Sequence, residues 1–255
     1  MTNTQIMEIT MQQSAIDCNC DAEDFKRSEN KVVISKENPL ARKYLVLPFY
    51  CDIVSYGNNI VASVNSEIAG VVTDYINKYS TEHCFETPNF HVLNDALQKR
   101  GMRVCFMAEY FLPDVTMLKR LTCNYKIKKL LPHEFAHLYT PEWTNALCEE
   151  RKISDVLALG AFDGDTLVGL AGCSADCETM WEIGVDVLPG YRKQGIASAL
   201  TSNLAVEVLN CGKVPFYCCA WSNIGSVKNA IASGFRPAWV QMTAKSTEFV
   251  DAMNA

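Results

Sequence analysis

A short polar segment in the second half of the chain carries the residues best suited to bind an anion. It follows an apolar run and reads Val185-Asp-Val-Leu-Pro-Gly-Tyr-Arg-Lys-Gln-Gly-Ile-Ala-Ser198. The pattern predicts a strand, a Pro-Gly turn and a helix whose first N–H groups have no intrahelical acceptor. The helix dipole and a glycine that allows close approach favour a diphosphate at this point. The predicted cradle consists of Arg192, Lys193, Gln194, Gly195, Ile196, Ala197 and Ser198.

The residues around this segment predict the elements that position it. Met180–187 is an apolar strand, and 195–209 is a helix that Gly212 ends. The buried stripe of this helix is predicted at Ile196, Leu200, Leu204 and Val208, which recur at helical spacing. A strand at 215–221 and a helix at 224–233, with Asn223 as its N-cap, complete a second strand-to-helix unit.

Two motifs together make the stretch from Leu121 to Ala244 resemble a GNAT acyltransferase domain. Residues 192–197 match the cofactor motif of that superfamily: Gln or Arg, two variable residues, Gly, one variable residue, then Gly or Ala. Residues 223–235 match its later segment, which runs from an asparagine to Gly-Phe. The order of strands and helices also agrees. The whole sequence is similar to two-part bacterial GNAT proteins whose substrate is unassigned.

The resemblance implies a fold, a cosubstrate and a reaction. The expected fold is α/β (α+β), with a mixed, mostly antiparallel central sheet flanked by helices. Acetyl-CoA would be the acyl donor, and a small-molecule or peptide amine would attack its thioester directly. The backbone of Val185 and Val187 would bind the pantetheine arm, and Asn223 joins the cofactor-binding set. Most of the rate would come from holding the two reactants in attack geometry.

A proton acceptor is needed because an alkyl ammonium has a pKa near 10.4. Glu182 is the predicted base and Asp186 the second choice; they lie on one face of the strand, two residues either side of Gly184. One position departs from the family pattern. Ala230 stands where many relatives carry a tyrosine that protonates the leaving thiolate. Tyr217 or a water could replace it, and a protein that binds acyl-CoA as a signal, without turnover, stays an alternative.

His133-Glu134-Phe-Ala-His137 matches the HExxH pattern of zinc hydrolases. On a helix the two histidines would share one face and chelate zinc, with the glutamate as base. Pro132 and Pro141 leave barely two turns for such a helix, and no third ligand is recognisable. We therefore expect a solvated helix face beside the acceptor cleft, with no metal.

The amino-acid composition limits the functional classes to which the protein can belong. The net charge of -6 argues against sequence-independent nucleic-acid binding, which needs a basic field. No stretch approaches the length of a membrane span, and the first twenty residues do not resemble a secretory signal. The 12 cysteines include Cys218-Cys219 and show no zinc spacing, so we expect reduced thiols in a cytoplasmic protein. In-strand packing is the expected role of Cys218 and Cys219, because nothing in the sequence indicates a lowered thiol pKa.

The chain is predicted to divide into residues 1–120, a mixed α/β subdomain, and residues 121–255, the acyltransferase domain. In the first part, runs at 52–56 and 60–64 form a hairpin across Gly57-Asn-Asn, and helices are predicted at 4–15, 66–79 and 90–100. A strand follows at 103–109. This part carries no chemical motif, so its expected role is to cover the acceptor cleft or to form a homodimer contact.

Overall fold

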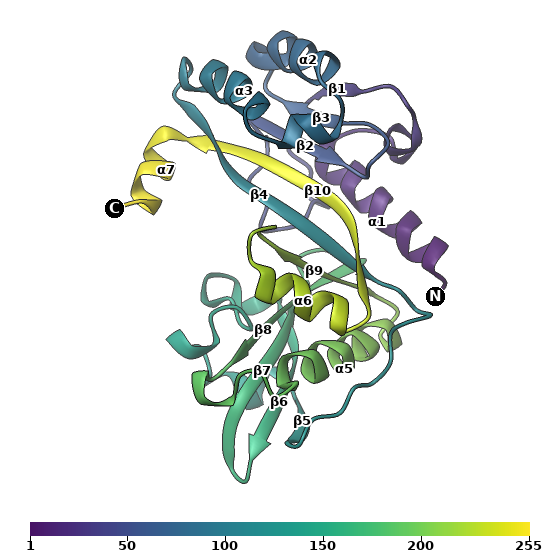
Figure 1. The fold of residues 1–255 in the computed structure, drawn as a ribbon, viewed down its shortest axis with the longest axis vertical. Helices are drawn as coiled ribbons and strands as arrows, with labels where there is room; N and C mark the ends of the chain where they lie inside the picture. Colours follow the sequence, from purple (N-terminus) through teal and green to yellow (C-terminus); the bar gives the residue numbers. More distant parts are fainter. The chain divides into compact units, whose positions relative to one another are not determined.

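The computed structural model describes all residues, 1–255 (Figure 1). The chain forms two compact units, each built from two segments. Unit 1 contains Met1–Thr10 and Phe111–Pro237, and unit 2 contains Met11–Tyr110 and Ala238–Ala255. The predicted domains, 1–120 and 121–255, are continuous stretches, and that assignment of domains stays a prediction.

Regular elements occupy most of both units. The helices are α1 (Asn3–Cys18), α2 (Ala69–Lys78), α3 (Asn89–Gln98), α4 (Pro132–Phe135), α5 (Ile196–Asn210), α6 (Ile224–Ala232) and α7 (Thr247–Met253). The strands are β1 (Lys31–Ile34), β2 (Cys51–Ser55), β3 (Val61–Val64), β4 (Met102–Pro113), β5 (Lys126–Leu130), β6 (Asp155–Asp163), β7 (Thr166–Ser174), β8 (Met180–Val187), β9 (Val214–Cys219) and β10 (Phe235–Ser246). No helix combines the length and the apolar character needed to cross a membrane.

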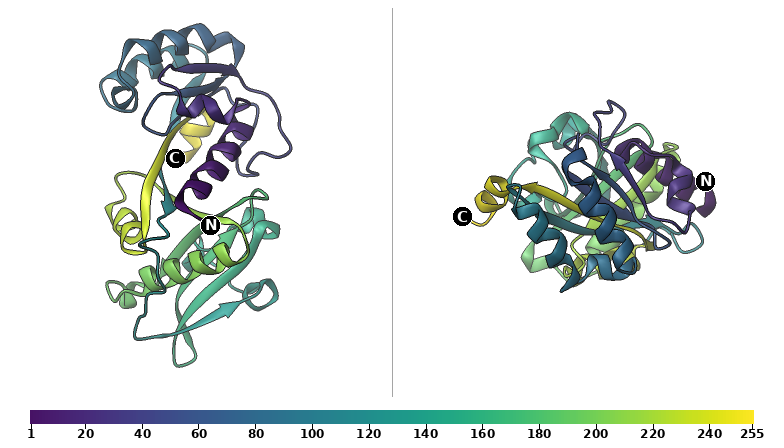
Figure 2. Two further views of the ribbon diagram at one scale, coloured as in Figure 1. Left: turned by 90° about the vertical axis from the view of Figure 1, so that its right-hand side faces the viewer. Right: turned by 90° about the horizontal axis from the view of Figure 1, so that it is seen from above.

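Unit 1 is built on a five-stranded sheet in the order β9-β8-β7-β6-β5. Neighbouring strands in this sheet pair antiparallel, except for β8 and β9, which are parallel. The segment Asp163-Gly164-Asp165, which lies between two apolar runs and so favours a hairpin turn, joins β6 to β7, and Gly164 adopts φ +58° there. Helix α5 lies along one face of this sheet (Figures 1 and 2). The expected mixed, mostly antiparallel sheet flanked by helices is therefore confirmed.

Helix α5 packs through the stripe that the sequence predicted. Ile196, Leu200, Leu204 and Val208 are all buried at 1% exposure or less. A glycine in β7 makes room for the first of them, because a Cβ at Gly169 would lie 2.6 Å from an Ile196 methyl carbon. The start of the helix is thereby fixed against the sheet.

Unit 2 confirms the predicted mixed α/β character. Its strands run in the order β1-β3-β2-β10-β4; β1 and β3 pair parallel, and the β3–β2 and β2–β10 pairs are antiparallel. The predicted hairpin is β2 and β3, and its turn uses Gly57 at φ +101°. Apolar residues of α2 and α3 pack with these strands in one cluster that includes Val72, Ile76 and Leu93.

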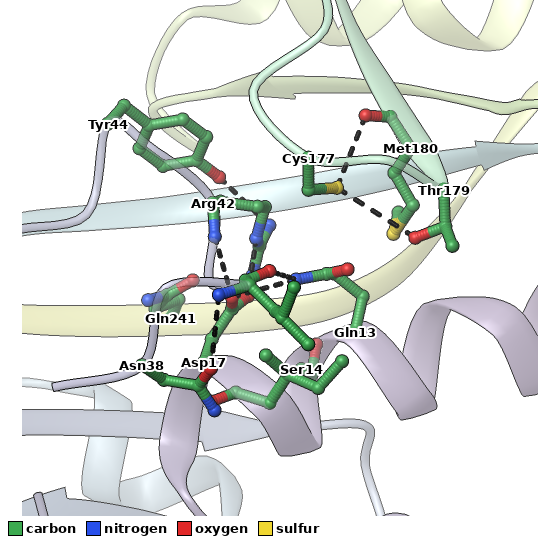
Figure 3. Close-up of polar contacts among 12 residues, drawn as sticks. Gln13, Ser14, Asp17, Asn38, Arg42, Tyr44, Cys177, Thr179, Met180 and Gln241 are labelled. Atoms are coloured by element: carbon green, nitrogen blue, oxygen red, sulfur yellow. Dashed lines mark hydrogen bonds and ion pairs between the residues drawn. The ribbon is translucent and has the colours of Figure 1, made fainter. Parts of the chain in front are cut away.

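A buried ion pair lies inside unit 2 (Figure 3). The Arg42 Nε donates to Asp17 Oδ2 at 2.6 Å, and both side chains are 2% exposed. The rings of Tyr44, Tyr110 and Trp239 lie 5.6–5.9 Å from the guanidinium carbon. Burial disfavours the charge, but the pKa of Arg42 is still raised, chiefly by Asp17. Such a pair is costly to break, because the remaining charge has no compensation.

Candidate active site

Strands β8 and β9 separate soon after they begin to pair. Their register contains three pairs, Met180↔Val214, Trp181↔Pro215 and Glu182↔Phe216. Strand β8 continues to Val187, and on its other edge it stays paired with β7. Part of the backbone of residues 183–187 therefore faces the opening without a strand partner. An extended ligand with amide groups can pair with such an edge.

A cavity of about 470 Å³ occupies the place where the two strands diverge. Strand β8 contributes Glu182, Ile183, Gly184 and Val185, and β9 contributes Tyr217, Cys218 and Cys219. Asn223 and Ser226, at the start of α6, also line it. Of the residues predicted for the site, the cavity brings together Glu182, Val185 and Asn223.

A loop crosses the sheet at this cavity because two glycines let it approach. A Cβ at Gly184 would lie 1.7 Å from the Asn145 carbonyl oxygen, and one at Gly172 would lie 2.1 Å from the Ala146 carbonyl oxygen. Asp186 fixes the same loop, since its carboxylate accepts the N–H groups of Asn145 and Ala146 at 2.8 and 2.9 Å. Asp186 thus anchors the loop, and Glu182 is the carboxylate of this strand face that reaches the cavity.

Replacing Gly184 by alanine is expected to displace this loop and to lower the free energy of unfolding by about 1–3 kcal/mol. Urea denaturation followed by circular dichroism measures the loss. Gly70→Ala is the matched control, because a Cβ there meets nothing within 4 Å and helix α2 should gain from alanine. Equal stability of Gly184→Ala and wild type would contradict the packing described.

Glu182 is half-buried and accepts a hydrogen bond from the Cys218 thiol, with Sγ 2.9 Å from Oε1. Arg151 also lines the cavity and pairs with buried Asp176. Burial opposes the charge of Arg151, yet Asp176, with weaker help from Cys148 and Glu182, raises its guanidinium pKa. This part of the cavity therefore contains a carboxylate whose neighbours are a thiol and a cation.

The predicted anion cradle follows β8 at the start of α5. Gly195 is the N-cap at φ +77°, and no side chain caps the helix. No N–H group of residues 195–198 donates a hydrogen bond to the chain. Lys193 also adopts a left-handed conformation, φ +63°, which costs a non-glycine residue about 1–2 kcal/mol. Strain together with unpaired donors is typical of a ligand-binding turn.

The side chains of Arg192 and Gln194 form hydrogen bonds that hold the turn before α5 in place. Arg192 Nε donates to the Val187 carbonyl oxygen at 3.0 Å, so the turn is fastened to the end of β8. Gln194 Oε1 accepts the Tyr125 hydroxyl at 2.6 Å. Ile196 is buried in the core, so among the predicted residues it can offer only its N–H group.

Gly195→Ala is expected to weaken acetyl-CoA binding about 5- to 30-fold, because a left-handed alanine costs about 1–2 kcal/mol and its methyl group occupies the approach. Isothermal titration calorimetry gives the dissociation constant. Gly190→Ala, in the same turn but without a positive φ, should leave it unchanged. If both variants bind acetyl-CoA alike, the prediction of an anion cradle at this helix start is wrong.

Tyr217 lies at the other wall of the cavity, on β9. Its hydroxyl is 2.9 Å from Ser226 Oγ, and its ring packs against Phe111 and Phe235. Burial raises its pKa, which keeps the hydroxyl protonated. Ala230, which occupies the usual tyrosine position, is fully buried.

The HExxH segment does not form the helix that its zinc interpretation requires. Helix α4 spans Pro132–Phe135, so His137 lies beyond its end. The Glu134 carboxylate accepts the N–H of Leu131 at 2.8 Å and caps the helix start. Both histidines are exposed. No group of three or more His, Cys, Asp or Glu side chains is placed to hold a metal ion.

A comparison of the sequence with models of known protein families finds a match within unit 1. Residues 124–230 match the model of the acetyltransferase (GNAT) family. This part of the chain, which contains the cavity and the turn at Gly195, belongs to that family. None of the curated proteins matches the chain.

Several solved bacterial structures are similar to the chain. A GNAT-family acetyltransferase from Novosphingobium aromaticivorans shares 19% identity over 56% of this chain and 66% of its own, with a TM-score of 0.41. A GCN5-related N-acetyltransferase-like protein from Streptococcus suis shares 18% sequence identity. The match covers 63% of this chain and 68% of the other, with a TM-score of 0.46. A GCN5-related N-acetyltransferase from Kribbella flavida shares 14% sequence identity. The match covers 64% of this chain and 65% of the other, with a TM-score of 0.48. The matched part spans about two thirds of each of these chains, and TM-scores below 0.5 leave activity to be inferred from the site.

Proposed function

We propose that the chain is an N-acetyltransferase that transfers an acetyl group from acetyl-CoA to a primary amine. The observation that supports this proposal is that strand β8 continues beyond its pairing with β9. Strand β8 loses its partner after Glu182, and beyond its end a turn leads into a helix whose first N–H groups donate to nothing. A free strand edge suits an amide-containing arm, and unpaired helical N–H groups suit a diphosphate.

The residues present fit acetyl-CoA. The backbone of Val185 and Val187 would pair with the pantetheine amides. The N–H groups of residues 195–198, with the positive charges of Arg192 and Lys193, would hold the diphosphate. Asn223 lines the cavity from the start of α6 and would contact the same arm.

The reaction forms one bond and breaks one. The amine nitrogen attacks the thioester carbon directly, the new C–N bond forms, the C–S bond breaks, and coenzyme A leaves as its thiolate. Glu182 accepts the proton that the ammonium form must lose. Tyr217 is the proposed proton donor to the thiolate, although a thiol with a pKa near 8.5 also leaves without full protonation.

One observation favours a second candidate, a protein that binds acyl-CoA without turnover. Ala230 removes the hydroxyl that relatives use toward the leaving thiolate. Tyr217 offers a hydroxyl in the same cavity, which is why we prefer the enzyme.

Two measurements on the full chain separate these functions. Calorimetry with acetyl-CoA tests binding, and a thiol-release assay across a panel of primary amines tests turnover. Binding with amine-dependent release supports the transferase. Binding without release for any amine supports the sensor, and absence of binding overturns both.

A further inference from the structure

Cys218 and Glu182 form a thiol–carboxylate pair inside the cavity. They come from different strands, and each lies at or just beyond the last β8–β9 pair, Glu182↔Phe216. Because side chains alternate along a strand, Phe216 and Cys218 share the face on which Glu182 lies. The Sγ to Oε1 distance is 2.9 Å, and both residues line the cavity.

The other thiols of the chain do not share this setting. Deep burial raises the pKa of Cys51 and Cys173 well above the ordinary value. Cys148 also lines the cavity, but burial raises its pKa and its thiol donates to Glu150, an exposed residue, at 3.5 Å. Cys219 faces the opposite side of β9 and packs against the apolar cluster beside α5.

A nucleophile and a base within hydrogen-bond distance are the arrangement that activates a thiol for covalent catalysis. The Cys218 thiol donates its hydrogen bond to Glu182, so this carboxylate is placed to take the thiol proton as Cys218 reacts. Arg151 also lines the cavity and places a positive charge near Glu182.

We infer that Cys218 is an acyl-accepting nucleophile: in the absence of an amine, it takes the acetyl group from acetyl-CoA and forms an S-acetyl thioester. This rests on the proposed function, because acetyl-CoA must reach the cavity. It adds a covalent route to the direct attack described above.

The step balances without an added reactant. Glu182 accepts the thiol proton, Cys218 Sγ bonds to the acetyl carbon, and the bond from that carbon to the coenzyme A sulfur breaks. The released thiolate takes the proton back from Glu182. One thioester of an alkyl thiol replaces another, so an amine can later remove the acetyl group and regenerate Cys218.

The test is intact-protein mass spectrometry after incubation of the full chain with acetyl-CoA alone, followed by peptide mapping. We expect one acetyl group on the peptide that contains Cys218, removable by neutral hydroxylamine, which cleaves thioesters. Cys218→Ser, which is nearly isosteric, should lack the hydroxylamine-labile adduct. Glu182→Gln should form it about 100-fold more slowly, because the base is lost.

Cys211→Ser is the control for unspecific acylation, because Cys211 is the exposed thiol and lies outside the cavity; it should form the adduct at the wild-type rate. Calorimetry on the same samples reports acetyl-CoA binding. Binding without an acetyl group on Cys218, or acetylation spread over other cysteines, would overturn the inference and leave the proposed function intact. Absence of binding would overturn both.

Discussion

Glu182→Gln is expected to lower the rate of amine acetylation by about 100- to 10,000-fold, the range that general bases contribute. The amide keeps the size of the side chain but cannot take a proton from the amine. Acetyl-CoA binding should stay within about threefold of wild type, because the proposed cosubstrate contacts are backbone groups of β8 and of the helix start. Steady-state thiol release with an amine that the wild type accepts measures the first quantity, and calorimetry measures the second.

Glu178→Gln provides a matched control for this change. Glu178 is the same residue type four positions earlier, is exposed, and does not line the cavity. The Glu178→Gln protein should acetylate amines at the wild-type rate. A Glu182→Gln protein that retains full activity would show that the proton goes elsewhere, with bulk water as the remaining acceptor.

Asp17→Ala is expected to lower the free energy of unfolding by about 3–5 kcal/mol, because it leaves the buried guanidinium of Arg42 without its counter-charge. The loss should appear in urea denaturation followed by tryptophan fluorescence. The Trp239 ring lies 5.7 Å from the Arg42 guanidinium carbon, so this signal reports on the affected region.

Two further variants separate the charge effect from a loss of packing. Glu149→Ala removes a partner from the exposed pair with Lys152 and should change stability by less than about 1 kcal/mol. The double variant Asp17→Leu with Arg42→Met replaces the buried pair by apolar side chains and should recover much of the loss. An Asp17→Ala protein as stable as wild type would mean that the pair contributes nothing.

The elements that the sequence predicted correctly depend on local patterns. Helix α5 shows its apolar stripe within fifteen residues, and both hairpins are marked by glycines between apolar runs. Strand β1 was missed, because Lys31–Ile34 is short and its pairing partner is β3, thirty residues away in sequence. Strand β4 is longer than the predicted 103–109, and helix α7 had no recognised signal. Their limits depend on tertiary packing that no local pattern contains.

The candidate site was predictable only where a single segment forms it. The turn from Val187 to Gly195 was recognisable because strand, turn and helix follow one another along the chain. The pair of Glu182 and Cys218 joins two strands, and its geometry comes from the register of β8 and β9. Gly172 and Gly184 gave no sign of their role, since only the folded loop at Asn145 shows what their missing Cβ atoms permit.

The pairing of β2 with β10 has a consequence for the order in which the chain acquires structure. Residues 52–55 hydrogen-bond with residues 240–243, almost two hundred positions later. During synthesis, the hairpin of β2 and β3 emerges early and must keep one exposed edge until the ribosome has delivered the last strand. Unit 2, although it contains most of the first hundred residues, is therefore the part of the molecule that can be completed last.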